Sequence, residues 1–104
     1  MKVPMLVLAA ALAAAGSAQA QDAKALLQKH GCTACHNDSK KVVGPAYVDV
    51  AAKYKGDANA AAKLAEKVKK GGSGVWGPVP MPPNAAVPDA DIKTMVAYVM
   101  SLKK

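Results

Sequence analysis

The chain has two cysteines, Cys32 and Cys35, and a histidine, His36, follows directly after the second. A disulfide between residues this close would brace almost nothing, so a small disulfide-stapled scaffold is excluded. The spacing instead brings two sulfurs and an imidazole together within one turn of chain. Any account of this sequence has to explain what these three side chains bind.

Cys-x-x-Cys-His is the attachment motif of c-type haem. In that chemistry, two thiols add across the two vinyl groups of the porphyrin and form thioether bonds. The two intervening residues let both sulfurs reach neighbouring pyrrole edges, and the adjacent imidazole ligates the iron. The motif therefore predicts that Cys32 and Cys35 hold a haem covalently and that His36 is an axial ligand.

Two other interpretations of the motif fit the sequence less well. A thioredoxin-like redox dithiol needs a βαβ context, and the chain has no alternating strand pattern. A zinc site needs further Cys or His ligands at suitable spacing, and the only other histidine is His30. The haem interpretation is favoured over both.

Residues 1–20 are predicted to be a cleaved signal peptide. Lys2 precedes an apolar run over 3–15, and Ala18-Gln19-Ala20 matches the small-x-small cleavage pattern. The run is shorter than the roughly 20 apolar residues of a spanning helix, which disfavours a retained anchor. We therefore expect one mature domain over 21–104, located in the periplasm, without stable membrane insertion.

The expected mature chain keeps 84 of the 104 residues, which is short for a self-sufficient core. A domain of this size buries only about 60% of the surface that its unfolded chain exposes. Many of its apolar residues are alanines, which bury little area each. Its aromatic residues are Tyr47, Tyr54, Trp76 and Tyr98. We therefore expect a large, flat, apolar cofactor to fill the centre.

The patterning of the expected mature chain predicts an all-α fold with one stiff loop. The helices are expected over 22–30, 46–53, 60–70 with Asn59 as N-cap, and from about Pro88 to the terminal lysines. Between them, eight of the fourteen residues over 71–84 are Gly or Pro, which indicates a loop.

The sixth ligand of the iron decides between electron transfer and chemistry at an open site. Met95 and Met100 lie in the last expected helix, where a methionine usually fills the core. Met81 lies in the 71–84 loop between prolines, which reduce the entropy lost in holding a ligand. His30 is too near His36 in sequence to reach the opposite haem face. Met81 is therefore the favoured ligand.

Taken together, these motifs resemble the small bacterial class I cytochromes c of the cytochrome c-551/c-552 group. The similarity covers nearly all of 21–104, and the methionine loop is its most specific part. The matching stretches are GCTACH (31–36), VGPAY (43–47), VAAKY (50–54), GVWG (74–77) and PMPPN (80–84). The resemblance implies about four short helices wrapped around one covalently attached haem c.

The resemblance also implies a role for each residue that matches the family's pattern. Cys32 and Cys35 would carry the thioether bonds, and His36 and Met81 would be the axial ligands. The Pro45 carbonyl would accept a hydrogen bond from the other ring nitrogen of His36. That bond would fix the tautomer of the imidazole and raise its basicity.

Three further positions are implied contacts of the cofactor. Asn84 would approach the Met81 sulfur and orient it. The indole N–H of Trp76 would reach a haem propionate, in addition to filling space. Lys67 stands where relatives often carry Arg near a propionate, and a lysine cannot make the bidentate pair of an arginine.

The function that this resemblance implies is soluble one-electron transfer between Fe(III) and Fe(II), with no enzymatic activity. Redox partners would include a nitrite reductase or terminal oxidase and a membrane quinol-oxidising complex, and the protein would be a monomer. The alternative is a haem enzyme or gas sensor with an open or displaceable sixth ligand. A subunit or detached domain of a larger oxidoreductase is a weaker third interpretation.

The charge of the chain is strongly positive, with a formal net charge of +7, and every basic residue is a lysine. The lack of arginine disfavours nucleic-acid binding, which relies on the forked guanidinium group. Steering toward acidic partners and simple solubility explain the charge about equally well. Seven of the thirteen lysines in the expected mature chain are lysines 40, 41, 53, 55, 67, 69 and 70.

Overall fold

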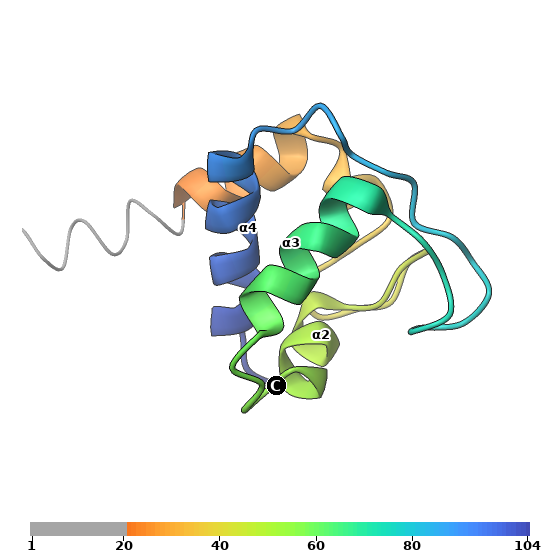
Figure 1. The fold of residues 1–104 in the computed structure, drawn as a ribbon. Helices are drawn as coiled ribbons and strands as arrows, with labels where there is room; N and C mark the ends of the chain where they lie inside the picture. The colour runs from red at the N-terminus through yellow and green to blue at the C-terminus, as the bar shows by residue number, and fades with distance from the viewer. Residues whose placement is uncertain (1–20) are drawn as a thin grey trace, which may run out of the picture.

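The computed structural model describes residues 21–104 and confirms the all-α prediction (Figure 1). The predicted signal peptide, residues 1–20, lies outside the described part of the chain. Residues 21–29 are helical, and a 3₁₀ turn spans Cys32–Ala34. The remaining helices are α2 (Tyr47–Lys53), α3 (Ala60–Lys70) and α4 (Asp89–Ser101). Over 21–104 there is no β-strand, only two isolated bridges.

The helix boundaries agree with the predicted ones to within a few residues, and the differences have local causes. Asn59 precedes α3, but its side chain makes no capping hydrogen bond. Instead, the carboxylate of Asp57 accepts a hydrogen bond from the backbone N–H of Asn59 at 2.8 Å. At the C-terminus, α4 stops at Ser101, and Lys104 pairs with Asp49 of α2 at 2.7 Å.

The core lies where α4 packs against α2 and α3. The side of α4 that faces them is aliphatic, as its helical spacing predicts. Ile92 is the most completely buried large side chain, with 2% of its surface exposed. The buried cluster comprises Leu27, Tyr47, Val50, Val87, Ile92, Met95, Val96 and Val99. With a single aromatic ring among them, these side chains form a compact but small core.

The N-terminal helix is tied to α4 by polar contacts as well as by packing. His30 Nε2 lies 3.1 Å from the Asp91 carboxylate in the first turn of α4. Near the other end of α4, the Tyr98 hydroxyl donates a hydrogen bond of 2.5 Å to Asp38. Burial and this hydrogen bond raise the pKa of Tyr98 to about 12. The chain on both sides of the Cys-x-x-Cys-His motif is thus anchored to one helix.

The 71–84 segment is a loop, as its composition predicts, and it leaves α3 at Gly71. It swings away from the helices and returns toward the start of α4 (Figure 1). None of the helices within 21–104 has the length and apolar character needed to cross a bilayer.

Replacing Ile92 by alanine tests whether the α4 face carries the core. Removing a buried aliphatic side chain leaves a cavity, so Ile92→Ala should lower the free energy of unfolding by about 2–5 kcal/mol. Guanidinium denaturation of the haem-loaded protein measures this change. Lys93→Ala, at the exposed neighbouring position, is the control and should leave the denaturation midpoint nearly unchanged. Equal midpoints for the two variants would contradict this core assignment.

Candidate functional site

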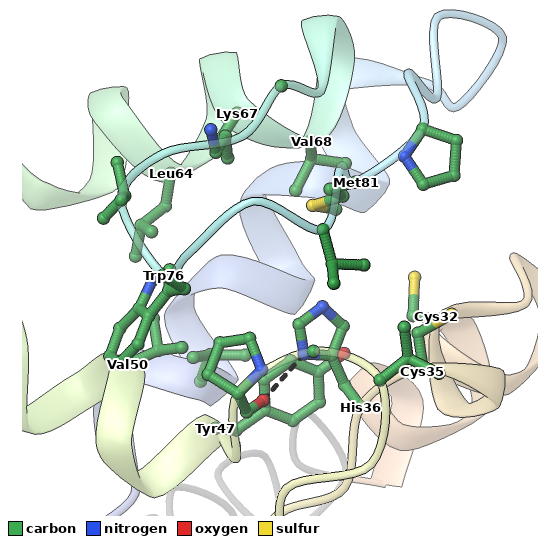
Figure 2. Close-up of a pocket in the computed structure, with 18 of the residues that line it drawn as sticks. Cys32, Cys35, His36, Tyr47, Val50, Leu64, Lys67, Val68, Trp76 and Met81 are labelled. Atoms are coloured by element: carbon green, nitrogen blue, oxygen red, sulfur yellow. Dashed lines mark hydrogen bonds between the residues drawn. The ribbon is translucent and has the colours of Figure 1, made fainter.

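A cavity of about 400 Å³ opens between the Cys-x-x-Cys-His segment, α2, α3 and the 71–84 loop. Its volume is in the range of small-molecule and cofactor sites. Cys32, Cys35 and His36 line it from one segment, and Met81 lines it from the loop. Figure 2 shows Met81 on the opposite side of this space from His36. The structure thus brings together the two sulfur donors, the imidazole and the thioether that the sequence singled out.

The His36 imidazole is held by a hydrogen bond at one nitrogen and by close neighbours around the ring. Its Nδ1 lies 2.8 Å from the Pro45 carbonyl oxygen, so this nitrogen carries the proton and donates it (Figure 2). Tyr47 stacks on the ring with centroids 4.9 Å apart and planes 18° apart. A Cβ at Gly44 would lie 2.5 Å from His36 Cε1, so only glycine permits this approach. In the neutral ring, the remaining nitrogen, Nε2, therefore carries the free electron pair and can act as a metal ligand.

Met81 is fixed through its main chain. Its N–H donates to the Gly72 carbonyl at 2.9 Å, and its carbonyl accepts from the Gly72 N–H at 3.0 Å. Gly71 has a φ of +68°, and a Cβ there would lie 2.8 Å from the Pro83 nitrogen and would also collide with the Met81 carbonyl. Two glycines at the end of α3 thus let the loop close on itself around Met81.

Asn84 anchors the loop to α3, which differs from the expected contact with the Met81 sulfur. Its backbone N–H donates to the Val68 carbonyl at 2.9 Å. Its side-chain amide donates to Val68 at 3.3 Å and to the Pro82 carbonyl at 3.1 Å. These backbone acceptors are left free at the end of a helix and in a proline-rich turn, and they engage the amide. Asn84 therefore positions the loop rather than the sulfur.

The two cysteines occupy the 3₁₀ turn after Gly31, and both are free and half-buried. Burial is the main cause that raises the pKa of Cys32 above its ordinary value. Reactive redox dithiols have a lowered cysteine pKa and a strand-turn-helix setting. The pKa of Cys32 is raised instead, and no strand lies beside this turn in residues 21–104, so the setting is not that of a redox dithiol.

Trp76 and Lys67 also line the cavity, Trp76 from the loop and Lys67 from α3. In Figure 2 both lie toward one end of the space, and Cys32 and Cys35 lie toward the other. His30, the other histidine of the chain, also borders the cavity, but its Nε2 is engaged by Asp91. The site therefore has a sulfur-bearing end and an end with an indole and an ammonium group.

The lining of this cavity fits a large apolar group. Among the described residues, five large hydrophobic side chains are exposed, and all but Val42 line this space. Apolar surface of this kind is costly to leave in water. The four that line the cavity are Val43, Val75, Trp76 and Val79. A flat macrocycle bound to both cysteines, between His36 and Met81, would cover them.

Comparison with known proteins agrees with this chemistry. The cytochrome c family model matches residues 20–103. The chain belongs to the cytochrome c family. It is 60% identical over 77 residues to cytochrome c-551 of Allochromatium vinosum, covering 74% of this chain and 82% of that protein. It is 54% identical over 95 residues to cytochrome c-552 of Nitrosomonas europaea, covering 91% and 90%.

The fold agrees as well. The crystal structure of cytochrome c552 from Nitrosomonas europaea superposes with a TM-score of 0.74 at 51% identity, covering 77% of this chain and 99% of that one. As a cytochrome c, this chain carries one haem c, covalently bound through Cys32 and Cys35, and it is a haem c electron carrier.

Several residues of this cytochrome c site escaped the sequence analysis. It assigned Gly44 and Tyr47 no role at His36, yet Tyr47 stacks on the ring and the absence of a side chain at Gly44 leaves room for it. Gly71 and Gly72 were predicted only as part of the 71–84 loop, yet Gly72 forms the bridge to Met81 and Gly71 lies against the Met81 carbonyl. A pair of glycines where one suffices to end a helix was the available signal.

Gly71→Ala tests whether this bridge holds Met81. A side chain at a positive φ costs about 1–3 kcal/mol by itself, and at Gly71 it also displaces the Met81 carbonyl. Gly74 is a matched control, because it has a φ of +105° and a Cβ there would contact nothing within 4 Å. We expect faster cyanide binding to oxidised Gly71→Ala than to Gly74→Ala. Similar rates in both would argue against the bridge.

A chain with Cys32→Ala and Cys35→Ala tests how far folding depends on haem attachment. The core is small and the large apolar cavity borders it, so the apoprotein should be largely disordered. Far-ultraviolet circular dichroism should show most of the helical signal lost relative to the haem-loaded protein. Native helicity without haem would show that the polypeptide folds on its own.

Proposed function

We propose that this cytochrome c is a soluble periplasmic one-electron carrier whose haem has His36 and Met81 as axial ligands. One observation carries the proposal: the two side chains enter the same cavity from opposite sides, each fixed by its own backbone contacts. With both axial positions supplied by the chain, no position is left for substrate. Outer-sphere electron transfer is the chemistry that such a closed site supports.

When bound, the haem supplies an iron that gains and loses one electron. His36 donates from Nε2, and its hydrogen bond to Pro45 makes that nitrogen more basic. The Met81 thioether favours the softer ferrous ion and so raises the reduction potential relative to a second histidine. The buried apolar lining acts in the same direction by disfavouring the extra positive charge of the ferric state.

The rigidity of the site supports fast electron transfer. Met81 is held by two backbone hydrogen bonds to Gly72, and Asn84 ties the following residues to α3. His36 is stacked and hydrogen-bonded. Ligands fixed in this way change little in position between the two oxidation states. A haem enzyme or gas sensor, the alternative, needs an open or displaceable sixth ligand. Met81 would then have to move, although the hydrogen bonds to Gly72 and the anchoring of Asn84 to α3 hold it in place.

At the other end of the cavity, Trp76 and Lys67 are suited to bind the haem propionates. The indole offers an N–H donor and the lysine a positive charge, and both line the space. Lys67 carries a compact ammonium group where an arginine would have a forked guanidinium. Its contact with a carboxylate therefore lacks the two parallel hydrogen bonds of an arginine pair.

The predicted signal peptide supports a periplasmic location, where an electron carrier meets its redox partners. Acidic docking sites on a nitrite reductase or terminal oxidase, and on a membrane quinol-oxidising complex, suit the positive charge of this chain. Contacts between such partners are small and transient, which suits a monomeric carrier. The proposal therefore includes association rates that fall as ionic strength rises.

Met81→Ala tests the ligand assignment. The covalent haem should remain, because Cys32 and Cys35 are untouched, and the reduction potential should fall once the thioether is lost. Carbon monoxide should bind the reduced variant. Met100→Leu, in the distal half of α4 outside the cavity lining, is the control and should leave both properties unchanged. An unchanged potential in Met81→Ala would show that another group ligates the iron.

A further inference from the structure

Trp76 lies at the tip of a tight turn that offers little support for its ring. The Gly74 N–H donates to the Gly77 carbonyl at 2.9 Å, and both glycines have positive φ. The indole is 42% exposed, although it also borders the cavity. To hold its N–H toward a ligand from this exposed turn, the indole of Trp76 needs a further contact that fixes the ring.

Lys53, the last residue of α2, supplies that contact. Its ammonium nitrogen lies 5.5 Å from the centroid of the Trp76 ring, within the range of a cation–π interaction. Tryptophan is the best aromatic partner for such a charge. This contact links the end of a helix to the tip of the loop, two elements that are remote in sequence.

No carboxylate of the described chain forms an ion pair with Lys53. Six of the seven acidic residues are engaged with other groups. Their partners are Tyr98, His30, Lys63, Lys69, Lys70 and Lys104. The positive charge at Trp76 therefore remains available to act on the cavity.

The position of this charge matches the chemistry of the cofactor. In a haem, the two carboxylates project from the edge away from the vinyl groups that form the thioethers. Figure 2 shows Trp76 and Lys67 at the end of the cavity away from Cys32 and Cys35. Lys53 is exposed and does not itself line the cavity, but its ammonium lies over the ring of Trp76, which does.

We propose that Lys53 is the positioning residue for Trp76: it holds the indole N–H toward a haem propionate and adds positive charge there. The proposal rests on the function proposed above, because it needs the haem in this cavity. Lys53 does not touch the iron ligands, so its effect is expected on the reduction potential and on Trp76, with the ligands unchanged.

Lys53→Met tests this role, because it keeps an unbranched apolar stem and removes the charge. The chain has one tryptophan, so the reduced, haem-loaded protein gives a single indole N–H signal in a proton–nitrogen correlation spectrum. We expect hydrogen exchange of this N–H to be about two- to fivefold faster in Lys53→Met. We also expect a lower reduction potential.

Lys55→Met is the matched control. It removes the same charge two positions further along, at an exposed residue that makes no contact with Trp76. Its potential should move less, and its indole exchange should stay at the wild-type rate. Lys53→Arg keeps the positive charge, and a guanidinium can stack on the indole. This variant should keep the wild-type reduction potential and the wild-type exchange rate of the indole N–H.

The outcomes separate this inference from the function on which it rests. If the reduced wild-type protein binds carbon monoxide readily, the closed His36–Met81 site is wrong, and a difference between Lys53→Met and Lys55→Met would still support the role of Lys53. If the wild-type site is closed but Lys53→Met and Lys55→Met behave alike, only the role of Lys53 is overturned. Loss of stability in Lys53→Met, with unchanged potential and indole exchange, would likewise reduce Lys53 to a structural contact.

Discussion

The hydrogen bond from His36 Nδ1 to the Pro45 carbonyl, at 2.8 Å, determines what the rest of this site can do. It fixes the tautomer, so that the nitrogen facing the cavity is the one with a free electron pair. The ring could not lie there if residue 44 had a side chain. Tyr47, the first residue of α2, stacks on the ring and belongs to the buried core, so the position of His36 depends on the packing of that core. One turn of chain thereby connects the proposed iron ligand with the packing of the domain.

On the opposite side of the cavity, Met81 is held by a loop and not by a helix or by packing against the core. Met81 belongs to a loop without helical hydrogen bonds, and its position depends on a two-bond bridge to Gly72 and on the anchoring of Asn84 to α3. Prolines around it restrict the backbone before folding begins. A local motif and a distant loop thus face each other across an apolar space, and the haem joins them. For that reason we expect cofactor binding and folding to be coupled.

Much of this arrangement could be predicted from the sequence. Helical spacing of apolar residues and the Gly- and Pro-rich composition of 71–84 predicted the elements, and Cys32 to His36 predicted the cofactor. The contacts of Asn84 and Gly44 could not be predicted in the same way, because they depend on which carbonyl or ring comes near in three dimensions. The end of α4 is a similar case, since Lys104 leaves the helix to pair with Asp49 of α2. Local propensity describes elements, and such long-range pairings decide their ends.

The central claim is that the chain itself fills both axial positions of the haem iron. An optical spectrum of the protein expressed in the periplasm tests this most directly, recorded oxidised and dithionite-reduced, before and after carbon monoxide. We predict sharp low-spin c-type bands in the reduced protein that carbon monoxide leaves unchanged. Ready binding of carbon monoxide would contradict the account, because it would mean that the sixth position is open or weakly held.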